Sequence, residues 1–535
     1  MRQRAIAWVM IGIVVLTGCT GRETALVRKE AAAAAFQPGG GKYAKELTVT
    51  VSRAITDPAE LRNDLEAKML KEKFNLVFKA TDYPRNDWAT KVTLQLASGE
   101  GPDFMPYTRD IWKSVEWMAS GLLRPFTQRE LKERLPHYLS NWTPQEWDTV
   151  FRSTRFSDGY LYFLPSQRTI PASSGWQYRK DLFDRYGLTF PHTPDEMLST
   201  LRTLKRQTGL IPIVANSSAA SPLVGISGFF QLFGMPELLL QWTSFVDPKT
   251  NAFTAYPMAT DLSRPLLSFL HQMYAENLML KNFATASNEQ VKKLVAQGHS
   301  VIMPTAVDPA YNNMLQSAVP GVNWVWADNY DHPSNDPNEI LYKRDSLYSY
   351  WGPAINKRTS PEKVDRLLDY LDWTQTEEGK RWYTYGKEGV TYTMKDGVPA
   401  LLPNMTTPLK PIGDSLPNYG INIGLIGYGG FITFHPSFNE TYSKPKLDIS
   451  RVLLNKPGYY GPVEPILQFT ENERKRAARL EAVLNGVRDE YWLKFIMGVL
   501  DPDKDKDWQS FLQAANDAGL DEVIQLRTRA YVRAQ

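Results

Sequence analysis

The first folded part of the chain alternates between a strand pattern and a helix pattern. Residues 47–51 read Leu-Thr-Val-Thr-Val, which has the two-residue period of a strand with one buried face. The segment 57–60 reads Asp-Pro-Ala-Glu, a helix start with a cap, a first-turn proline and a glutamate at the third helical position. A second strand is predicted over 75–80, a second helix over 88–96 and a third strand from Pro102. This alternation predicts an α/β fold with a parallel sheet covered by helices.

Three further helices are predicted in the rest of the chain. Residues 193–196, Thr-Pro-Asp-Glu, form a capping box with proline at the first helical position, and Ser360-Pro361 opens a helix with one apolar face. Asp507 is expected to cap a last helix that carries Trp508. Residues 397–465 are rich in Pro, Gly and Asn with few periodic runs, so we expect an irregular excursion there and not a separate domain.

The N-terminal segment predicts export from the cell. Arg2 and Arg4 precede an apolar run over 5–16 that is too short to cross a bilayer as a permanent helix, so residues 1–18 are expected to be a signal peptide. The run ends in Leu-Thr-Gly-Cys, which resembles the bacterial lipobox and predicts a diacylglyceryl group on Cys19. The alternative is an ordinary residue in a secretory signal, but Cys19 is the only cysteine in 535 residues.

The segment between the signal peptide and the first strand predicts a tether. Residues 19–46 contain an alanine run and a Pro-Gly-Gly-Gly sequence and are poor in apolar side chains, so we expect a flexible, lipid-anchored spacer. With a single cysteine, no disulfide can form within the chain, and stability must come from the packed core.

Size and composition narrow the classes of function. The chain exceeds the length at which single cores stop growing, so two lobes are expected. Removal of Arg2 and Arg4 with the signal peptide reduces the formal charge from +3 to about +1, and no long basic tract is present, so a nucleic-acid partner is not expected. Aromatic residues make up 12% of the chain, enough for stacking surfaces as well as for the core that most of these rings are expected to fill.

Signatures of metal and catalytic chemistry are missing from the sequence. The histidines are scattered and none is paired at a zinc-ligand spacing, and there is no G-x-S-x-G elbow. Four alternating aspartates from Asp501 to Asp507 resemble the opening of a calcium loop, but Lys506 stands where the tight-turn glycine is needed and Leu512 where the bidentate glutamate is needed. We expect no metal, no cofactor and no catalytic residue.

Several short motifs follow one another at specific spacings along the chain. They are Pro102-Asp103-Phe104, Gly121 to Pro125, Asp158 to Pro165, Tyr178 to Phe183 with Gly187-Leu188, the segment 191–196, Gly386 to Val390, and Asp507-Trp508. In this order they resemble the family 1 extracellular solute-binding proteins, in the long lipoprotein branch found in Gram-positive bacteria that live on plant polysaccharides. The resemblance covers nearly all of the chain after Cys19.

The resemblance implies a two-lobed α/β fold of the periplasmic-binding-protein type II, with a ligand cleft that closes by hinge bending. It also implies a monomer at the extracellular face of the membrane that binds a sugar, an oligosaccharide in this branch, and delivers it to the permease subunits of an ABC importer without acting as an enzyme. The lobes are expected over 47–168 with 352–395 and over 169–351 with 396–535, and the chain is expected to cross between them near 165–172, 347–352 and 393–397.

A cleft for a sugar needs aromatic rings for the C–H faces and planar polar side chains for the hydroxyl edges. Four segments after strand ends or at crossings offer such groups, as the resemblance implies. The candidate ligand-binding residues are Tyr107, Arg109 and Trp112; Gln167, Arg168 and Trp176; Asp308 and Tyr311; and Tyr348, Tyr350 and Trp351.

Structural roles compete with each of these ligand roles. Trp112 lies on a predicted helix and fits a core position equally well, and one of Tyr348 and Tyr350 can be buried because they alternate along a strand. Trp176 and Trp351 are the favoured rings because they adjoin expected crossings. Arginines such as Arg109 and Arg168 fit a uronate carboxylate if the sugar is acidic, or a surface ion pair if it is not.

Two alternatives to a sugar receptor stay open at this point. A surface-anchored polysaccharide-degrading enzyme would carry the same export signal, tether and aromatic cleft, since paired glycosidase carboxylates have no fixed spacing in sequence. A lipoprotein that assists the folding of exported proteins would show a broad apolar surface. In several relatives an acidic calcium loop follows the helix that starts at 193–196, but residues 205–212 lack the acidic ligands, so no calcium is expected there.

Overall fold

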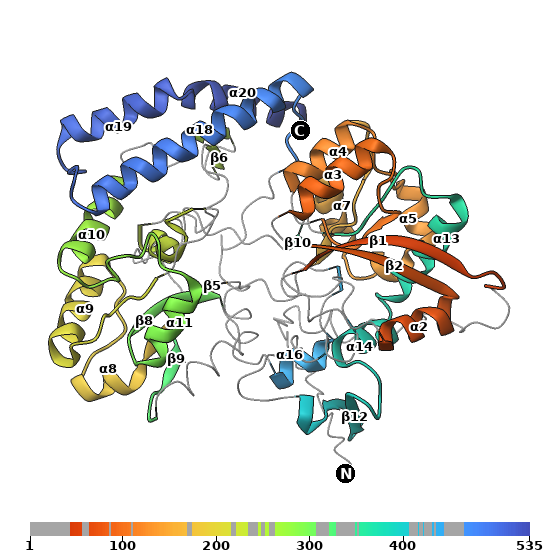
Figure 1. Cartoon of the computed structure of the whole chain (residues 1–535), viewed down its shortest axis with the longest axis horizontal. Helices are drawn as coiled ribbons and strands as arrows, with labels where there is room; N and C mark the ends of the chain where they lie inside the picture. Colours follow the sequence, from red (N-terminus) through yellow and green to blue (C-terminus); the bar gives the residue numbers. More distant parts are fainter. Residues whose placement is uncertain are drawn as a thin grey trace, which may run out of the picture.

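Helices and strands gather around two hydrophobic cores that lie side by side in the computed structural model of the chain (Figure 1). We refer to the body that holds the first strands of the sequence as lobe 1 and to the other as lobe 2. The structure describes residues 43–55, 64–84, 87–108, 111–167, 174–215, 221–233, 244–247, 252–255, 263–306, 320–327, 348–349, 352–405, 416, 421, 431–432, 435–442 and 465–534.

Lobe 1 is built on a four-stranded sheet in the order β11-β3-β1-β2. Its two long strands are parallel, with Leu47 opposite Leu76, and α2 and α3 make the connections between successive strands. The predicted strand–helix alternation is confirmed, although the third strand is short. The elements are β1 (Leu47–Ile55), α2 (Asp64–Phe74), β2 (Leu76–Pro84), α3 (Trp88–Ser98), β3 (Phe104–Met105) and β11 (Ala354–Ile355).

Further helices of lobe 1 pack on this sheet and close its core. Phe74, Tyr370 and Trp373 lie in ring contact there, with centroids 5.6 Å apart for each pair that includes Phe74. The remaining elements are α4 (Ile111–Ala119), α5 (Gln128–Arg134), α6 (Pro136–Leu139), α7 (Pro144–Thr154), α13 (Pro361–Trp373), α14 (Glu377–Tyr385), β12 (Tyr392–Lys395), β13 (Val398–Leu401), η5 (Pro403–Met405) and α16 (Pro436–Tyr442).

Lobe 2 has a three-stranded sheet in the order β8-β5-β9 with helices around it. The predicted capping box is confirmed at one of these helices, where the Thr193 hydroxyl accepts from the Glu196 N–H and the Glu196 carboxylate accepts from the Thr193 N–H. The elements are β5 (Ser174–Arg179), α8 (Lys180–Tyr186), α9 (Pro194–Thr208), η2 (Val224–Phe233), β6 (Ser244–Asp247), β7 (Ala252–Ala255), α10 (Arg264–Ala275), α11 (Asn288–Ala296), β8 (Ile302–Ala306) and β9 (Trp324–Trp326).

Three C-terminal helices form an arch over the top of the view in Figure 1: α18 (Glu471–Ile496), α19 (Asp505–Asp517) and α20 (Leu520–Ala534). Before α18, Ile466 packs in lobe 1 and its N–H donates to the carbonyl of Ser153 at 2.9 Å. Near the other end of α18, Trp492 packs in the core of lobe 2. The chain therefore passes between the lobes along this helix. The expected cap at Asp507 is wrong, because α19 begins at Asp505 and the Asp507 carboxylate accepts from the Asp501 N–H instead.

The packing divides the chain differently from the expected boundary at residues 395 and 396. Leu401, Phe431 and Phe438 belong to the core of lobe 1, whereas residues 396–535 were expected in lobe 2. The crossing expected near 393–397 is also wrong, since β12 and β13 pair as a hairpin whose turn residue Asp396 has a φ of 53°. A loop-rich stretch carries no periodicity that tells which core its few apolar residues join.

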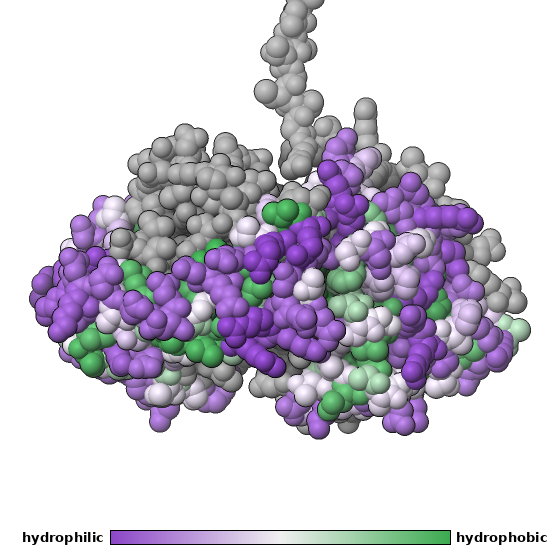
Figure 2. All heavy atoms as spheres, turned by 90° about the horizontal axis from the view of Figure 1, so that it is seen from above, coloured by the Kyte–Doolittle hydropathy of each residue, from purple (hydrophilic) through white to green (hydrophobic). Residues whose placement is uncertain are grey.

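The surface is mostly polar where the structure describes it. Figure 2 shows hydrophilic residues over most of the described surface on one face, with hydrophobic residues in small patches between them. None of the helices in the described ranges combines the length and the apolar character needed to cross a membrane.

Candidate ligand-binding site

Two crossings of the chain between the lobes lie next to each other. β4 (Ser166–Gln167) leads out of lobe 1, and the next described strand is β5 in lobe 2. β10 (Tyr348–Ser349) leads back, and it pairs antiparallel with β4, with Tyr348 opposite Gln167. Two of the expected candidates therefore share one ladder at the junction of the lobes, where the first two crossings were expected.

Tyr107 is held beside the second crossing by its neighbour. Both the N–H and the hydroxyl of Thr108 donate to the carbonyl of Gly352, at 3.2 and 2.9 Å. Gly352 in turn lies against the backbone of lobe 1, because a Cβ there would fall 1.6 Å from the carbonyl oxygen of Leu164. A side chain at residue 352 would push β10 away from lobe 1. The half-buried Tyr107 is therefore held next to the residue that follows the second crossing.

Gln167 is fixed by a polar chain that sequence reasoning missed. Its side-chain amide donates to the backbone carbonyl of Asn141 at 2.7 Å. The Asn141 side chain donates to Gln375 at 2.9 Å and accepts from the Lys380 ammonium at 2.6 Å. Burial lowers the pKa of Lys380, opposed by the nearby charge of Glu377. Because Asn141 and Lys380 lie far apart in the sequence, no local pattern links them.

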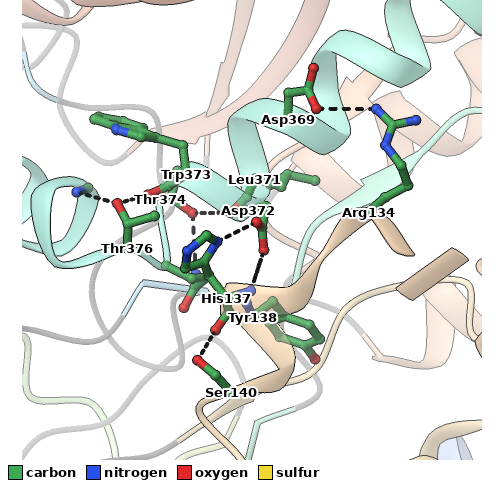
Figure 3. A network of polar contacts seen from close by, with 12 residues as sticks. Arg134, His137, Tyr138, Ser140, Asp369, Leu371, Asp372, Trp373, Thr374 and Thr376 are labelled. Carbon is green, nitrogen blue, oxygen red and sulfur yellow. Dashed lines mark hydrogen bonds and ion pairs between the residues drawn. The ribbon is translucent and has the colours of Figure 1, made fainter. Parts of the chain in front are cut away.

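A second network, shown in Figure 3, fixes the segment that holds the start of the first crossing. The Asp372 carboxylate accepts from the backbone N–H groups of His137 and Tyr138, at 2.8 and 3.1 Å, and contacts the His137 ring at 2.6 Å. Burial raises the pKa of Asp372, and the hydrogen bonds from His137 and Tyr138 oppose that shift. This network attaches α6 to α13, and the Tyr138 hydroxyl donates to the carbonyl of Pro165, directly before β4. The crossing therefore starts from a fixed point in lobe 1.

On the side of lobe 2, two described strand ends that border candidate segments pair with each other. Ser174, where β5 begins, pairs with Ala306, where β8 ends. Residues shortly after β8 were expected to carry Asp308 and Tyr311, and those before β5 the first crossing. The antiparallel register therefore places the start of β5 beside the end of β8.

Trp176 is placed in the core of lobe 2. Its side chain is 4% exposed and its ring lies 5.1 Å from that of Phe229 in an edge-to-face arrangement. It also contacts Phe190 at a ring distance of 6.4 Å. This burial favours the packing role that competed with a stacking role, and sugar contact by Trp176 stays a prediction.

Two further candidates lie in described elements. Trp112 lies in α4 and Tyr348 in β10, and in both cases only the backbone is described. Outside the described residues lie Cys19 with the rest of the tether before Tyr43, and the candidates Arg109, Arg168, Asp308, Tyr311, Tyr350 and Trp351.

The described residues hold no group of three or more His, Cys, Asp or Glu side chains placed to bind a metal ion. In the last turn of α9, the Lys205 ammonium donates to the carbonyls of Glu276 and Asn277 at 2.7 and 2.9 Å. The Lys205 ammonium thus already binds the carbonyl oxygens of Glu276 and Asn277 beside the end of α9. At the Asp-rich turn, Asp505 pairs with Arg264 and Asp503 accepts from Ser268.

Known proteins resemble this chain in sequence and in fold. The sequence model of the family described as bacterial extracellular solute-binding protein matches residues 58–380. A curated relative is the melibiose/raffinose/stachyose-binding protein MelE of Bacillus subtilis, 24% identical over 263 residues, which are 47% of this chain and 54% of MelE. The chain thus spans about half the length of this curated relative.

Solved structures resemble the chain over most of its length. The alginate-binding protein AlgQ2 without calcium ion has a TM-score of 0.69 at 18% identity, covering 91% of this chain and 98% of AlgQ2. A human-milk-oligosaccharide (HMO) binding solute-binding protein associated with an ABC transporter of Bifidobacterium longum infantis has a TM-score of 0.70 at 14% identity, covering 91% and 99%. At these identities the likeness shows the fold alone, and it confirms the predicted two-lobed α/β architecture.

Proposed function

The chain belongs to the bacterial extracellular solute-binding protein family, and we propose that it binds an oligosaccharide between its lobes and delivers it to an ABC importer. The observation that carries the proposal is the pairing of Gln167 with Tyr348 in the two strands that lead between the lobes. Thr108, the neighbour of Tyr107, is bonded to Gly352 just after the second of these strands. The names of MelE and of the human-milk-oligosaccharide-binding protein support a sugar as the ligand class.

The geometry of the crossing suits capture by closure. The paired strands β4 and β10 are only two residues long each, so a small change in backbone angles there can rotate one lobe relative to the other. Gln167 is oriented in advance by Asn141, which reduces the entropy lost when its amide meets a hydroxyl. Closure would bury aromatic faces and polar edges against the sugar at the same time, and the sugar would leave unaltered.

We also propose that the protein is a monomer held at the extracellular face of the membrane by a diacylglyceryl group on Cys19, with permease subunits as its partner. The support is the signal and lipobox pattern before the tether, together with the family. Cell fractionation tests the anchor: the Cys19→Ala protein should appear in the medium or remain with an uncleaved signal peptide. Unchanged membrane retention with a normally cleaved signal peptide would refute lipid anchoring.

A ligand screen tests the function itself. Neutral and acidic oligosaccharides are added to the purified protein, and thermal stability and binding heat are measured. A ligand near one hundred times its dissociation constant should add about 2.7 kcal/mol to the free energy of unfolding. After prolonged incubation, chromatography should return the same oligosaccharide. Cleavage products would instead favour the polysaccharide-degrading enzyme, and stabilisation by no sugar would sink the receptor proposal.

A further inference from the structure

A pocket of about 220 Å³ opens on lobe 1 between α2, α14 and the turn that leads into β12. None of its lining residues belongs to β4 or β10. Helix α14 contributes to both places with different faces, since Lys380 reaches Asn141 near the crossing while Arg381 and Trp382 line the pocket. The pocket is therefore distinct from the candidate site between the lobes.

Two aromatic residues, Trp382 and Tyr392, are among the lining residues of this pocket. Trp382 is half-buried, and its ring is held edge-to-face against Tyr383 at 4.9 Å. The carbonyl of Trp382 accepts from the N–H of Gly386 at 2.7 Å, which fixes the helix end beside it. Tyr392, only 5% exposed, together with Leu65 and Met69, adds to the apolar lining. A flat, pre-positioned indole at a partly open pocket is the surface on which the C–H face of a sugar ring can stack.

The charge of the pocket is decided by one arginine. Glu378 is already engaged, with the Lys73 ammonium at 2.6 Å and the Trp373 indole N–H at 2.9 Å. Within the described ranges, no carboxylate lies at ion-pair distance from Arg381. At the rim, the exposed lysines Lys68 and Lys387 are balanced by two exposed glutamates. Arg381 is thus a half-buried guanidinium beside an aromatic ring and, among the described residues, makes no ion-pair contact with a carboxylate. Its charge helps to lower the pKa of the nearby Glu377 and Glu378, and its side chain also interacts with Tyr392 in the pocket wall.

We propose that this pocket is a second binding site, for a single sugar ring that carries a carboxylate. Small-molecule sites are typically about 300–1,000 Å³, so a smaller cavity fits one ring and not an extended chain. The ring stacks on Trp382 and the carboxylate meets the planar fork of Arg381, the geometry in which arginine binds carboxylates with two hydrogen bonds. The site would hold a uronate unit of an acidic glycan on the outside of lobe 1.

Binding of glucuronate, with glucose as its uncharged match, tests the proposal. Saturation-transfer NMR and calorimetry at millimolar sugar should show glucuronate binding that Arg381→Gln weakens at least about tenfold, the size expected for losing a charged hydrogen-bonded pair. Arg381→Lys keeps the positive charge but lacks the planar pair of donors. Its affinity for glucuronate should therefore lie between those of the parent protein and Arg381→Gln. Arg129→Gln is the matched control on an exposed helix of the same lobe and should change nothing.

The outcomes separate this site from the site between the lobes. Glucuronate binding that survives Gln167→Ala and is lost in Arg381→Gln supports the pocket, even if no oligosaccharide binds between the lobes. Binding that is lost in Gln167→Ala but kept in Arg381→Gln overturns the pocket and leaves the proposed function standing. Equal binding of glucose and glucuronate, or binding of neither, also overturns it. Thermal melts of each variant verify that the fold is intact.

Discussion

The hydroxyl of Tyr138 donates a hydrogen bond of 2.6 Å to the carbonyl oxygen of Pro165, the residue before the first crossing strand. Tyr138 is 2% exposed, and burial raises the pKa of its phenol well above the ordinary value, so the hydroxyl remains a donor at neutral pH. Since α6 is attached to α13 through Asp372, this bond connects the crossing to the core of lobe 1.

Removing that hydroxyl should destabilise lobe 1. Tyr138→Phe leaves the buried Pro165 carbonyl without this donor, and we expect the free energy of unfolding to fall by about 1–2 kcal/mol in denaturant titrations. Tyr160→Phe is the control, because Tyr160 is 41% exposed and water can replace any bond of its hydroxyl. Equal effects of the two variants would show that the bond to Pro165 contributes nothing.

A side chain at residue 352 should disturb the crossing. In Gly352→Ala the new Cβ would meet the Leu164 carbonyl oxygen at 1.6 Å, so backbone must move, and we expect both stability and oligosaccharide binding to fall. Gly486→Ala is the matched control, because nothing lies within 4 Å of its Cβ and it sits inside α18. That change should stabilise the protein by about 0.5–1 kcal/mol. A melting temperature unchanged in Gly352→Ala would contradict the close approach.

Glu473 should give the protein an acid-dependent contribution to stability. Burial alone would raise its pKa, but hydrogen bonds from Thr470, Arg529 and Arg533 lower it to about 2 from an ordinary value of 4.5. A depressed carboxyl pKa stabilises the fold above the unfolded value and loses this effect as pH falls from about 4.5 toward 2.

The test compares Glu473→Gln with the parent protein across pH. At pH 7 the variant should be less stable by about 1–2 kcal/mol, since it weakens a capping box and two contacts with α20. The difference should shrink as the pH falls below about 4.5. Glu471→Gln, in the same first turn but fully exposed, should have a smaller effect. A gap that stays constant down to pH 2 would exclude a titrating Glu473.

Gln167 should contribute directly to ligand affinity. Loss of one pre-oriented amide from a sugar edge should weaken binding by about 1 kcal/mol or more, roughly fivefold or more in the dissociation constant. The measurement is calorimetry with an oligosaccharide that binds the parent protein. Gln128→Ala, on the exposed start of α5, is the matched control and should bind normally. If Gln167→Ala binds the oligosaccharide with normal affinity, the ligand does not contact Gln167 at this crossing.

The local elements of this protein were predictable because their signals lie within a few residues. The capping box at Thr193 and Glu196, the alternating pattern of β1 and each short family motif depend on positions a few residues apart. The two-lobed fold followed from those motifs together with the length of the chain.

Contacts between segments far apart in the sequence were visible only in the tertiary structure. The contact between Lys380 and Asn141, the burial of Trp176 against Phe229, and the packing of Phe438 in lobe 1 join segments that no periodicity connects. The sequence by itself determined which segments form helices and strands, since backbone hydrogen bonds and amphipathic spacing are local. Only the tertiary structure decided which aromatic rings fill a core and which polar groups meet at the crossing, because burial and hydrogen-bond partners depend on residues far away in the chain.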